Sequence, residues 1–170
     1  MSHRVTSRPW PGVERWQNRA MDDPALATLL ETFYANISGP AGSPRPPASE
    51  SDLYHPQARL MRSGVDEAGR PWLQVMTHAE WLEDTRPFFA STDFYEIEVA
   101  RHAERFGNVA WVRSVYEARR HPDDPELLKR GVNSIQLYHD GERWRIVGVL
   151  WDNERPGVVV PPEWLSGRPG

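Results

Sequence analysis

Three side chains of this sequence could together transfer protons: Asp152, Tyr34 and Tyr116. A carboxylate beside a phenol can take a proton from one atom of a bound molecule and return it to another, which is general acid/base chemistry. We therefore treat these three as candidate catalytic residues. A solvated or salt-bridged carboxylate is the simpler interpretation of Asp152, because perturbed carboxylates are a minority even in cavities.

Asn133 is a polar residue on a strand face that is otherwise apolar. In the hairpin described below it faces Gly148, and a small residue beside a buried amide leaves room for a ligand. An unpaired buried amide costs roughly 1–3 kcal/mol, so some group must bond it. That group is either a ligand or a neighbouring side chain or buried water, and the sequence leaves both alternatives open.

Several other kinds of chemistry have no support in the sequence. It contains no cysteine, which excludes disulfides, thiolate nucleophiles and cysteine-ligated metals. Its six histidines show no spacing typical of a metal site. It has no phosphate-binding loop, no G-x-G-x-x-G and no G-x-S-x-G nucleophile motif. We expect no metal, no cofactor, and neither nucleotide-dependent nor serine-hydrolase activity.

Charge and hydropathy limit the partners. The formal net charge of −4 gives an average field that does not attract nucleic acid or an anionic membrane. The N-terminus has no apolar region typical of a signal peptide, and no run of about 18 apolar residues could span a bilayer. With the lack of cysteine, this predicts a cytoplasmic protein that binds neither nucleic acid nor membrane. A chain of 170 residues is long enough to bury one core.

Two long helices are predicted from apolar residues at helical spacing. The first begins after Asp23, an N-cap that precedes proline, and ends before the Gly-Pro pair at 39–40. The second begins at a T-x-x-E capping box that starts at Thr77. Between them we expect a short helical turn at 52–54 and a short strand at 58–62.

Two hairpins follow the second helix. Residues 94–106 and 108–120 read as two long strands with a tight turn between them. The stretch 131–152 contains two more strands around Asp140-Gly141, a pair that supplies the positive φ angles of a two-residue type I′ turn. That turn predicts these pairs on the inner face: Leu137 with Trp144, Ile135 with Ile146, Asn133 with Gly148, and Gly131 with Leu150. Asp152 follows on the same face.

The order of these elements indicates an α+β fold in which one curved antiparallel sheet wraps around two or three helices. Such a sheet forms a cone with a cavity on its inner side. We expect this domain to span residues 23–153, with an N-terminal arm at 1–22 and an extended C-terminal tail at 154–170.

Five segments, which together cover roughly residues 25–153, carry a resemblance to a known family. They are LLETFYANIS, LYHPQARLM, THAEWLEDTRPFF, GNVAWVRSVYEAR and GVNSIQLYHDGERWRIVGVLW. In order and spacing they resemble the nuclear transport factor 2-like superfamily, and within it the SnoaL-like group of small bacterial proteins. The resemblance implies a cystatin-like cone. Members include ketosteroid isomerases, polyketide cyclases, dehydratases, epoxide hydrolases and pure binding or dimerisation modules, so membership does not select a function.

The same resemblance bears on isomerase chemistry. Ketosteroid isomerases place an oxyanion-donating tyrosine where this sequence has Tyr34. Where they carry their carboxylate base, this sequence has Arg62, so the proton-abstracting group is missing. Isomerase chemistry is therefore disfavoured.

The inner face predicts an aromatic-lined cavity that binds a small hydrophobic molecule. Its expected lining residues are Tyr34, Trp81, Phe88, Val112, Ser114, Tyr116, Asn133 and Leu150. There are two alternatives. One is a cofactor-independent lyase, isomerase or cyclase that acts on a hydrophobic carbonyl compound. The other is a dimerisation module whose cavity is filled by its own side chains.

An apolar patch is expected on the outer face of the sheet, and such patches usually mark interfaces. It consists of Trp111, Val115, Val132, Val149 and Trp151. We therefore predict a homodimer formed through this face, as the resemblance also implies. A covering N-terminal or C-terminal arm is the alternative.

Overall fold

The computed structural model describes residues 23–46 and 52–166 of the chain. The arm predicted at 1–22 lies outside the described residues. In chain order the described elements are α1 (Pro24–Ile37), β1 (Tyr54–Val65), β2 (Pro71–Met76), α3 (His78–Ser91), β3 (Tyr95–Phe106), β4 (Val109–Arg119), β5 (Lys129–His139), β6 (Trp144–Asn153) and the 3₁₀ helix η2 (Pro162–Trp164).

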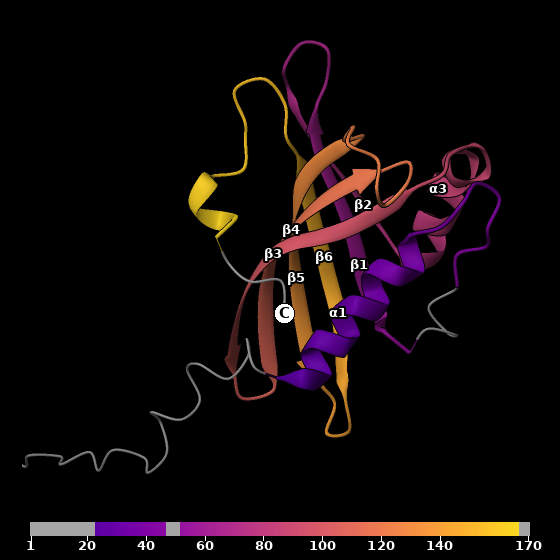
Figure 1. Ribbon diagram of the computed structural model, residues 1–170. Coiled ribbons are helices and arrows are strands. Elements are labelled where there is room, and N and C mark those ends of the chain that lie inside the picture. The colour runs from indigo at the N-terminus through magenta and orange to yellow at the C-terminus, as the bar shows by residue number, and fades with distance from the viewer. Residues whose placement is uncertain (1–22, 47–51, 167–170) are drawn as a thin grey trace, which may run out of the picture.

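The strands of the described residues form one six-stranded sheet in the order β2-β1-β6-β5-β4-β3. Neighbouring strands are antiparallel except β1 and β6, which run parallel. The sheet is curved, α1 lies across it, and α3 packs near β1 and β2 (Figure 1). This is the α+β arrangement of a curved sheet around helices that the sequence predicts.

Helix α1 starts where its N-cap signal lies in the sequence. Asp23 Oδ1 accepts hydrogen bonds from the amides of Ala25 at 3.0 Å and Leu26 at 3.4 Å. The buried side of the helix consists of Leu26, Leu29, Leu30, Phe33, Tyr34 and Ile37. The candidate residue Tyr34 therefore lies on the buried side of this helix.

Helix α3 confirms the predicted capping box. The Thr77 hydroxyl accepts from the amide of Glu80 at 3.2 Å, and Glu80 Oε2 accepts from the amide of Thr77 at 2.7 Å. These two bonds satisfy amides at the start of the helix that have no partner within it. Trp81 and Phe89 then pack into the core between α3 and the sheet.

The helical turn predicted at 52–54 is wrong. Leu53 and Tyr54 are buried, and Tyr54 begins β1, where it pairs with Ile146 of β6. Burial against the core outweighs a weak local preference for helix. Strand β1 is also longer than predicted, and it folds back into β2, a strand that the sequence analysis missed.

The connection between β5 and β6 corrects the predicted register. His139 pairs with Trp144, so the loop holds four residues instead of two. Asp140 Oδ1 closes this loop by accepting from the amides of Glu142 and Arg143, both at 2.9 Å. An aspartate-capped loop therefore replaces the type I′ turn.

A bulge at Val147 shifts the register again. Leu137 pairs with Ile146, but the next residue back along β5, Gln136, pairs with Gly148. The predicted partner of Gly148 was Asn133, which pairs with Trp151 instead. Because a one-residue bulge moves later side chains to the opposite face, the pattern expected for the end of β6 is inverted.

The exposure of the side chains at the end of β6 shows this exchange of faces. Val149 is buried in the core, and Trp151 packs against it. Leu150 is 40% exposed, and Asp152 pairs with Val132 on the outer face. Val149 and Trp151 were therefore wrongly assigned to the outer patch, and Leu150 and Asp152 were wrongly assigned to the inner face.

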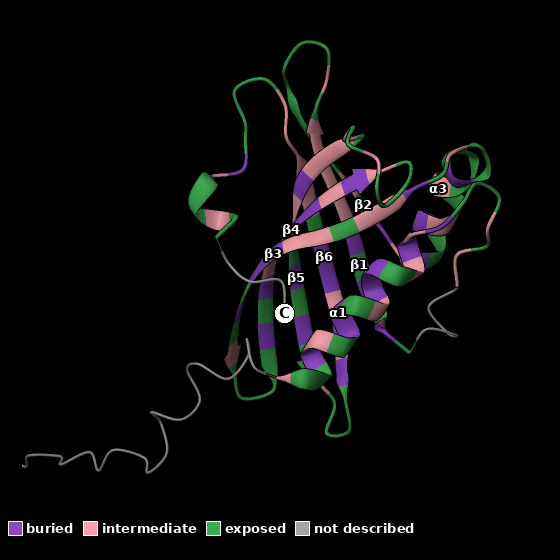
Figure 2. Ribbon diagram, viewed as in Figure 1, coloured by how far each residue is buried: buried purple, intermediate pink, exposed green. Residues whose placement is uncertain are grey.

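The main core lies between the sheet and the two helices, and buried and exposed positions alternate along β4 and β5 (Figure 2). The inner residues of β4, which include three of the predicted lining residues, are all buried: Ala110, Val112, Ser114, Tyr116 and Ala118. None of the helices in the described part of the chain has the length and apolar character needed to cross a membrane.

The C-terminal tail covers part of the outer face. Val160 and Trp164 pack there against Val115 and Val132. The Arg113 guanidinium lies 4.1 Å from the centroid of the Trp164 ring. This arrangement is the alternative that the sequence offered to a dimer interface.

The predicted homodimer remains a prediction, on a smaller surface than expected. Of the five residues assigned to the interface, only Trp111 is substantially exposed, at 40%. Its indole Nε1 donates a hydrogen bond to Glu104. Any second copy that docked on this face would therefore meet Trp111 and the tail rather than a bare apolar patch.

The substitution Gly131→Ala tests the close packing of β5 against Tyr116. A Cβ at position 131 would lie 2.5 Å from both Tyr116 Oη and the Asp152 carbonyl oxygen, whereas a Cβ at Gly148 would meet no atom closer than 3.6 Å. We expect Gly131→Ala to lower the free energy of unfolding by about 1–3 kcal/mol. The control Gly148→Ala should change it by about 0.5 kcal/mol or less. Urea denaturation measures both values, and equal stabilities of the two variants would contradict the packing described.

Candidate functional site

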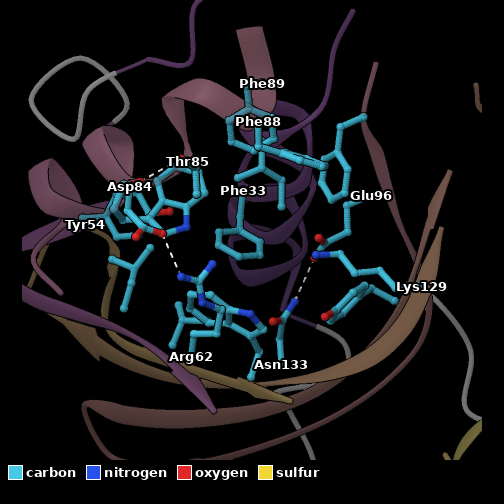
Figure 3. A pocket seen from close by; sticks show the side chains of 17 residues that line it. Phe33, Tyr54, Arg62, Asp84, Thr85, Phe88, Phe89, Glu96, Lys129 and Asn133 are labelled. Carbon is cyan, nitrogen blue, oxygen red and sulfur yellow. Dashed lines mark hydrogen bonds and ion pairs between the residues drawn. The ribbon is translucent and has the colours of Figure 1, made fainter. Parts of the chain in front are cut away.

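A cavity of about 240 Å³ lies between the inner face of the sheet and the two helices (Figure 3). Its apolar lining consists of Phe33, Ile37, Tyr54, Leu60, Trp81, Phe88, Phe89, Phe94, Tyr116, Val149 and Trp151. Its polar lining consists of Arg62, Asp84, Thr85, Glu96, Lys129 and Asn133. The wall is thus mainly apolar and rich in aromatic rings, with six polar side chains that face the same space.

Glu96 and Lys129 are placed together by the sheet register. Glu96 on β3 and Lys129 on β5 both pair with Ala118 on the strand between them. Because the side chain of Ala118 is small and fully buried, the space above it is left to the two longer side chains. Both reach the cavity from this side (Figure 3).

Burial changes the acidity of both groups. Desolvation raises the pKa of Glu96 to about 7, against the opposing effects of the Lys129 charge and a hydrogen bond from Asn133. Desolvation also lowers the pKa of Lys129, while the charge of Glu96 raises it and the charge of Arg62 lowers it further. Near neutral pH, the Glu96 carboxyl therefore exists in both its protonated and its ionised form.

Asn133 links Glu96 to a chain of buried polar side chains. Its Nδ2 donates to Glu96 Oε1 at 3.2 Å and to Tyr34 Oη at 3.1 Å. The hydroxyls of Tyr34 and Ser114 share a hydrogen bond of 2.6 Å, and Ser114 donates to Glu98. The Asn133 amide is thus bonded by neighbouring side chains, which is one of the two alternatives that the sequence left open.

The chain ends at a buried ion pair between Glu98 and Arg101. Arg101 Nε donates to Glu98 Oε2 at 2.9 Å, and the two side chains are only 8% and 3% exposed. A bulge at Val99 makes this possible, since Glu98 and Arg101 lie on the same face only because the strand gains a residue between them. Buried charges need such a partner, because removing one of the pair leaves the other uncompensated.

Arg62 lies on the wall formed by β1, opposite α3. Its Nη2 donates to Gln74 Oε1 at 2.6 Å and to Asp84 Oδ2 at 2.8 Å, and Gln74 Nε2 donates to Asp84 Oδ1 at 3.2 Å. The Nε of Arg62 is buried and has no hydrogen-bond partner among the residues that the structure describes. The guanidinium is therefore held in place with one buried donor unsatisfied.

The structure gives a mixed result for the predicted lining residues. Four of them line the cavity: Trp81, Phe88, Tyr116 and Asn133. Three are buried in the core and do not line it: Tyr34, Val112 and Ser114. Leu150 is placed wrongly, because the β6 bulge directs it outward. Contact of any of these residues with a ligand remains a prediction.

The placement of Asp152 inside the cone is also wrong. Its Oδ1 accepts from Arg155 Nη1 at 2.7 Å and from the amide of Asn153 at 2.8 Å, and its side chain is 40% exposed. The salt-bridged alternative is therefore correct. The physical reason is again the bulge in β6, which turns Asp152 to the outer face.

The two candidate tyrosines retain protonated phenols at neutral pH. Burial raises the pKa of Tyr34 and of Tyr116 far above the usual value, and the charge of Glu96 raises both further. Tyr116 Oη donates to Asn153 Oδ1 at 2.6 Å. Both phenols are therefore confined to hydrogen bonding, and Tyr34 acts on the cavity only through Asn133.

Sequence reasoning missed Glu96, Lys129 and Asp84 as site residues. Lys129 shares the inner face of β5 with Asn133, so the two-residue period of the strand could have identified it. The same argument fails for Glu96. The bulge at Val99 changes which residues of β3 face inward, and no residue type in the sequence marks its position.

The substitution Glu96→Gln tests the raised pKa through stability. The folded protein holds a proton on Glu96 up to about pH 7, whereas the unfolded chain releases it near pH 4.5. The stability that this group contributes is therefore fully present below its pKa in the unfolded chain. It is lost as the pH rises through its pKa in the folded protein. Between about pH 5 and about pH 8, the free energy of unfolding of the wild type should fall by about 1–3 kcal/mol more than that of Glu96→Gln.

Urea denaturation at a series of pH values makes this measurement. Glu67→Gln, at an exposed carboxylate, is the control and should keep the wild-type slope. The same slope in the wild type and in Glu96→Gln would contradict burial of the Glu96 carboxyl.

The sequence matches no protein-family model and no curated protein. The solved structures that resemble the fold include three proteins at TM-scores above 0.5. A protein of unknown function from Mycobacterium tuberculosis is 14% identical with a TM-score of 0.59, and the match covers 84% of this chain and 79% of the other. A protein with a cystatin-like fold from Nostoc punctiforme is 10% identical with a TM-score of 0.57, covering 79% and 92%. A nuclear transport factor 2-like protein of unknown function from Pseudomonas putida is 9% identical with a TM-score of 0.55, covering 77% and 85%.

At sequence identities this low, the likeness shows a shared fold and does not show a shared function. The prediction of fold from the sequence is confirmed: the chain has the nuclear transport factor 2-like fold, which is also described as cystatin-like.

Proposed function

We propose that the protein binds a small, mostly apolar molecule in the cavity between the sheet and the helices. The observation that carries this proposal is the composition of the wall, in which aromatic rings dominate and a few polar groups converge. Binding sites for small molecules have this composition. A purely structural core would fill such a space with side chains, because protein interiors are close-packed.

The cavity volume limits the size of the molecule. An apolar cavity of about 150 Å³ is large enough for benzene. A volume of about 240 Å³ therefore suits roughly ten non-hydrogen atoms, such as one aromatic ring with a short polar substituent. A four-ring steroid is too large for this space.

The polar groups would fix the orientation of the molecule. Glu96, Lys129 and Asn133 lie together on the β3–β5 side, while Arg62 and Asp84 lie on the side of β1 and α3 (Figure 3). The rings of Phe33, Phe88 and Phe89 lie around the rest of the space. An amphipathic molecule would place its ring against these phenylalanines and its polar end against the charged groups.

A second candidate function is a cofactor-independent lyase, isomerase or cyclase that acts on a hydrophobic carbonyl compound. The observation that favours it is a Glu96 carboxyl with a pKa of about 7 beside the Lys129 cation. A general base works best when its pKa lies near the working pH. Glu96 would take the proton next to the carbonyl, and the Lys129 ammonium would stabilise the enolate oxygen.

The binding proposal is tested by filling the cavity with Thr85→Trp. Thr85 lines the cavity, whereas the Glu83 side chain is 68% exposed on the same helix, so Glu83→Trp is the matched control. We expect phenylacetamide, a one-ring amide of the required size, to bind the wild type and Glu83→Trp equally. Thr85→Trp should bind it at least about tenfold more weakly, because the indole takes up its space.

Ligand-observed NMR titration measures these affinities. Equal binding by Thr85→Trp and the wild type would move the site elsewhere. No binding by the wild type would support the remaining alternative, a cavity that the chain fills itself.

The catalytic candidate is tested by proton exchange in D₂O. If Glu96 abstracts a proton, the protein should accelerate deuterium incorporation next to the carbonyl of phenylacetone, as followed by NMR. Glu96→Gln should slow this exchange by about 10²–10⁴-fold, while Glu67→Gln should leave it unchanged. Exchange at the same rate in the wild type and in Glu96→Gln would exclude Glu96 as the base.

A further inference from the structure

We propose that the molecule bound in the cavity carries a carboxylate, which Arg62 and Lys129 hold. This inference rests on the proposed function and names the chemical class of its ligand: a one-ring aryl carboxylic acid, of which phenylacetate is the simplest example of the right size.

The first observation is the unsatisfied Nε of Arg62. Bonds from Nη2 to Gln74 and Asp84 hold one side of the guanidinium in place, and neither bond involves Nε. This donor is buried in a residue that lines the cavity, and it has no partner in the described part of the chain. Since arginine can only donate, the group that satisfies it must be an acceptor.

The second observation is that Lys129 brings another cation to the same space. Its ammonium lies 5.2 Å from the centroid of the Phe94 ring, and Lys129 lines the same cavity as Arg62. The charges of Lys129 and Arg62 act unfavourably on each other. An anion that faces both would remove this repulsion and would accept charge-assisted hydrogen bonds.

The carboxyl groups of the cavity do not cancel this positive charge. Asp84 is already paired with Arg62 at 2.8 Å and also accepts from Gln74. Glu96 faces Lys129, but burial keeps much of this carboxyl protonated near neutral pH. With one full carboxylate against two cations, the cavity retains a net positive charge that favours a singly charged anion.

The lining also explains why the anion should be a carboxylate on an aromatic ring. A guanidinium matches the planar, two-oxygen geometry of a carboxylate, and charge-assisted hydrogen bonds of this kind are strong. The rest of the wall is aromatic, so the remainder of the molecule must be apolar. Roughly ten non-hydrogen atoms allow one ring and the acid group.

The experiment compares phenylacetate with phenylacetamide, which has the same shape and no charge. Calorimetric titration at neutral pH gives the dissociation constant of each with the wild-type full chain. We expect phenylacetate to bind at least about tenfold more tightly than the amide, because charge-assisted hydrogen bonds are the stronger kind.

Two substitutions locate the effect. Arg62→Lys keeps the positive charge beside Asp84 but removes the Nε donor, and Lys129→Gln removes the other cation. Each should reduce the preference for the acid to about threefold or less, because acid binding weakens more than amide binding. Arg59→Gln, on the exposed side of β1, is the control and should keep the full preference. Circular dichroism confirms that the variants are folded, and the amide affinity shows that their cavities are intact.

The outcomes separate this inference from the proposed function. Equal affinity of the wild type for acid and amide would overturn the carboxylate inference and leave the cavity as a binding site. An acid preference that survives both Arg62→Lys and Lys129→Gln would overturn the assigned residues. Failure of the wild type to bind either compound would overturn the proposed function, and the inference with it.

Discussion

Two single-residue bulges determine which side chains of β3 and β6 face the cavity. One is at Val99 in β3 and the other is at Val147 in β6. Each bulge bends its strand and exchanges the inner and outer faces beyond it. The first places Glu96 inside and the second places Trp151 inside, while Asp152 is turned out. The curvature of the sheet and the chemistry of its inner face therefore have the same structural origin.

The polar groups inside the sheet differ in how well the chain itself satisfies them. Asn133, Tyr34 and Ser114 form a continuous series of hydrogen bonds that ends at the paired Glu98 and Arg101. A fully bonded buried series is rigid, because breaking any member leaves its neighbours unpaired. The neighbouring cavity instead contains polar groups that the chain solvates or hydrogen-bonds only in part.

This contrast indicates that the hydrogen-bonded series has a structural role and that the cavity groups have a binding role. The bonded series holds Asn133 still and so helps to position Glu96. Glu96, Lys129 and Arg62 carry the consequences of incomplete solvation, which are shifted acidity and an unsatisfied donor. Groups of this kind are costly to bury without a partner, and a ligand is one way to offset that cost.

The sequence predicted the fold better than the site, and the reason is local geometry. The Asp23 cap and the Thr77 capping box marked both long helices, because capping depends on a few adjacent residues. The inner face of β4 was also predictable, since that strand has no bulge and alternates regularly. Glu96 was missed and Asp152 was misplaced, because a bulge exchanges the two faces of a strand and no residue type marks its position. The pairing register of β5 and β6 was also mispredicted, because a four-residue loop closed by Asp140 replaces the expected tight turn.

The most direct test of this account is the titration of the Glu96 side-chain carboxyl by ¹³C NMR, with its signal assigned from its absence in Glu96→Gln. If the β3 bulge turns this group into a poorly solvated cavity, the midpoint should lie at about 7. A midpoint near the ordinary value for glutamate, about 4.5, would show a solvated carboxyl and contradict the site described.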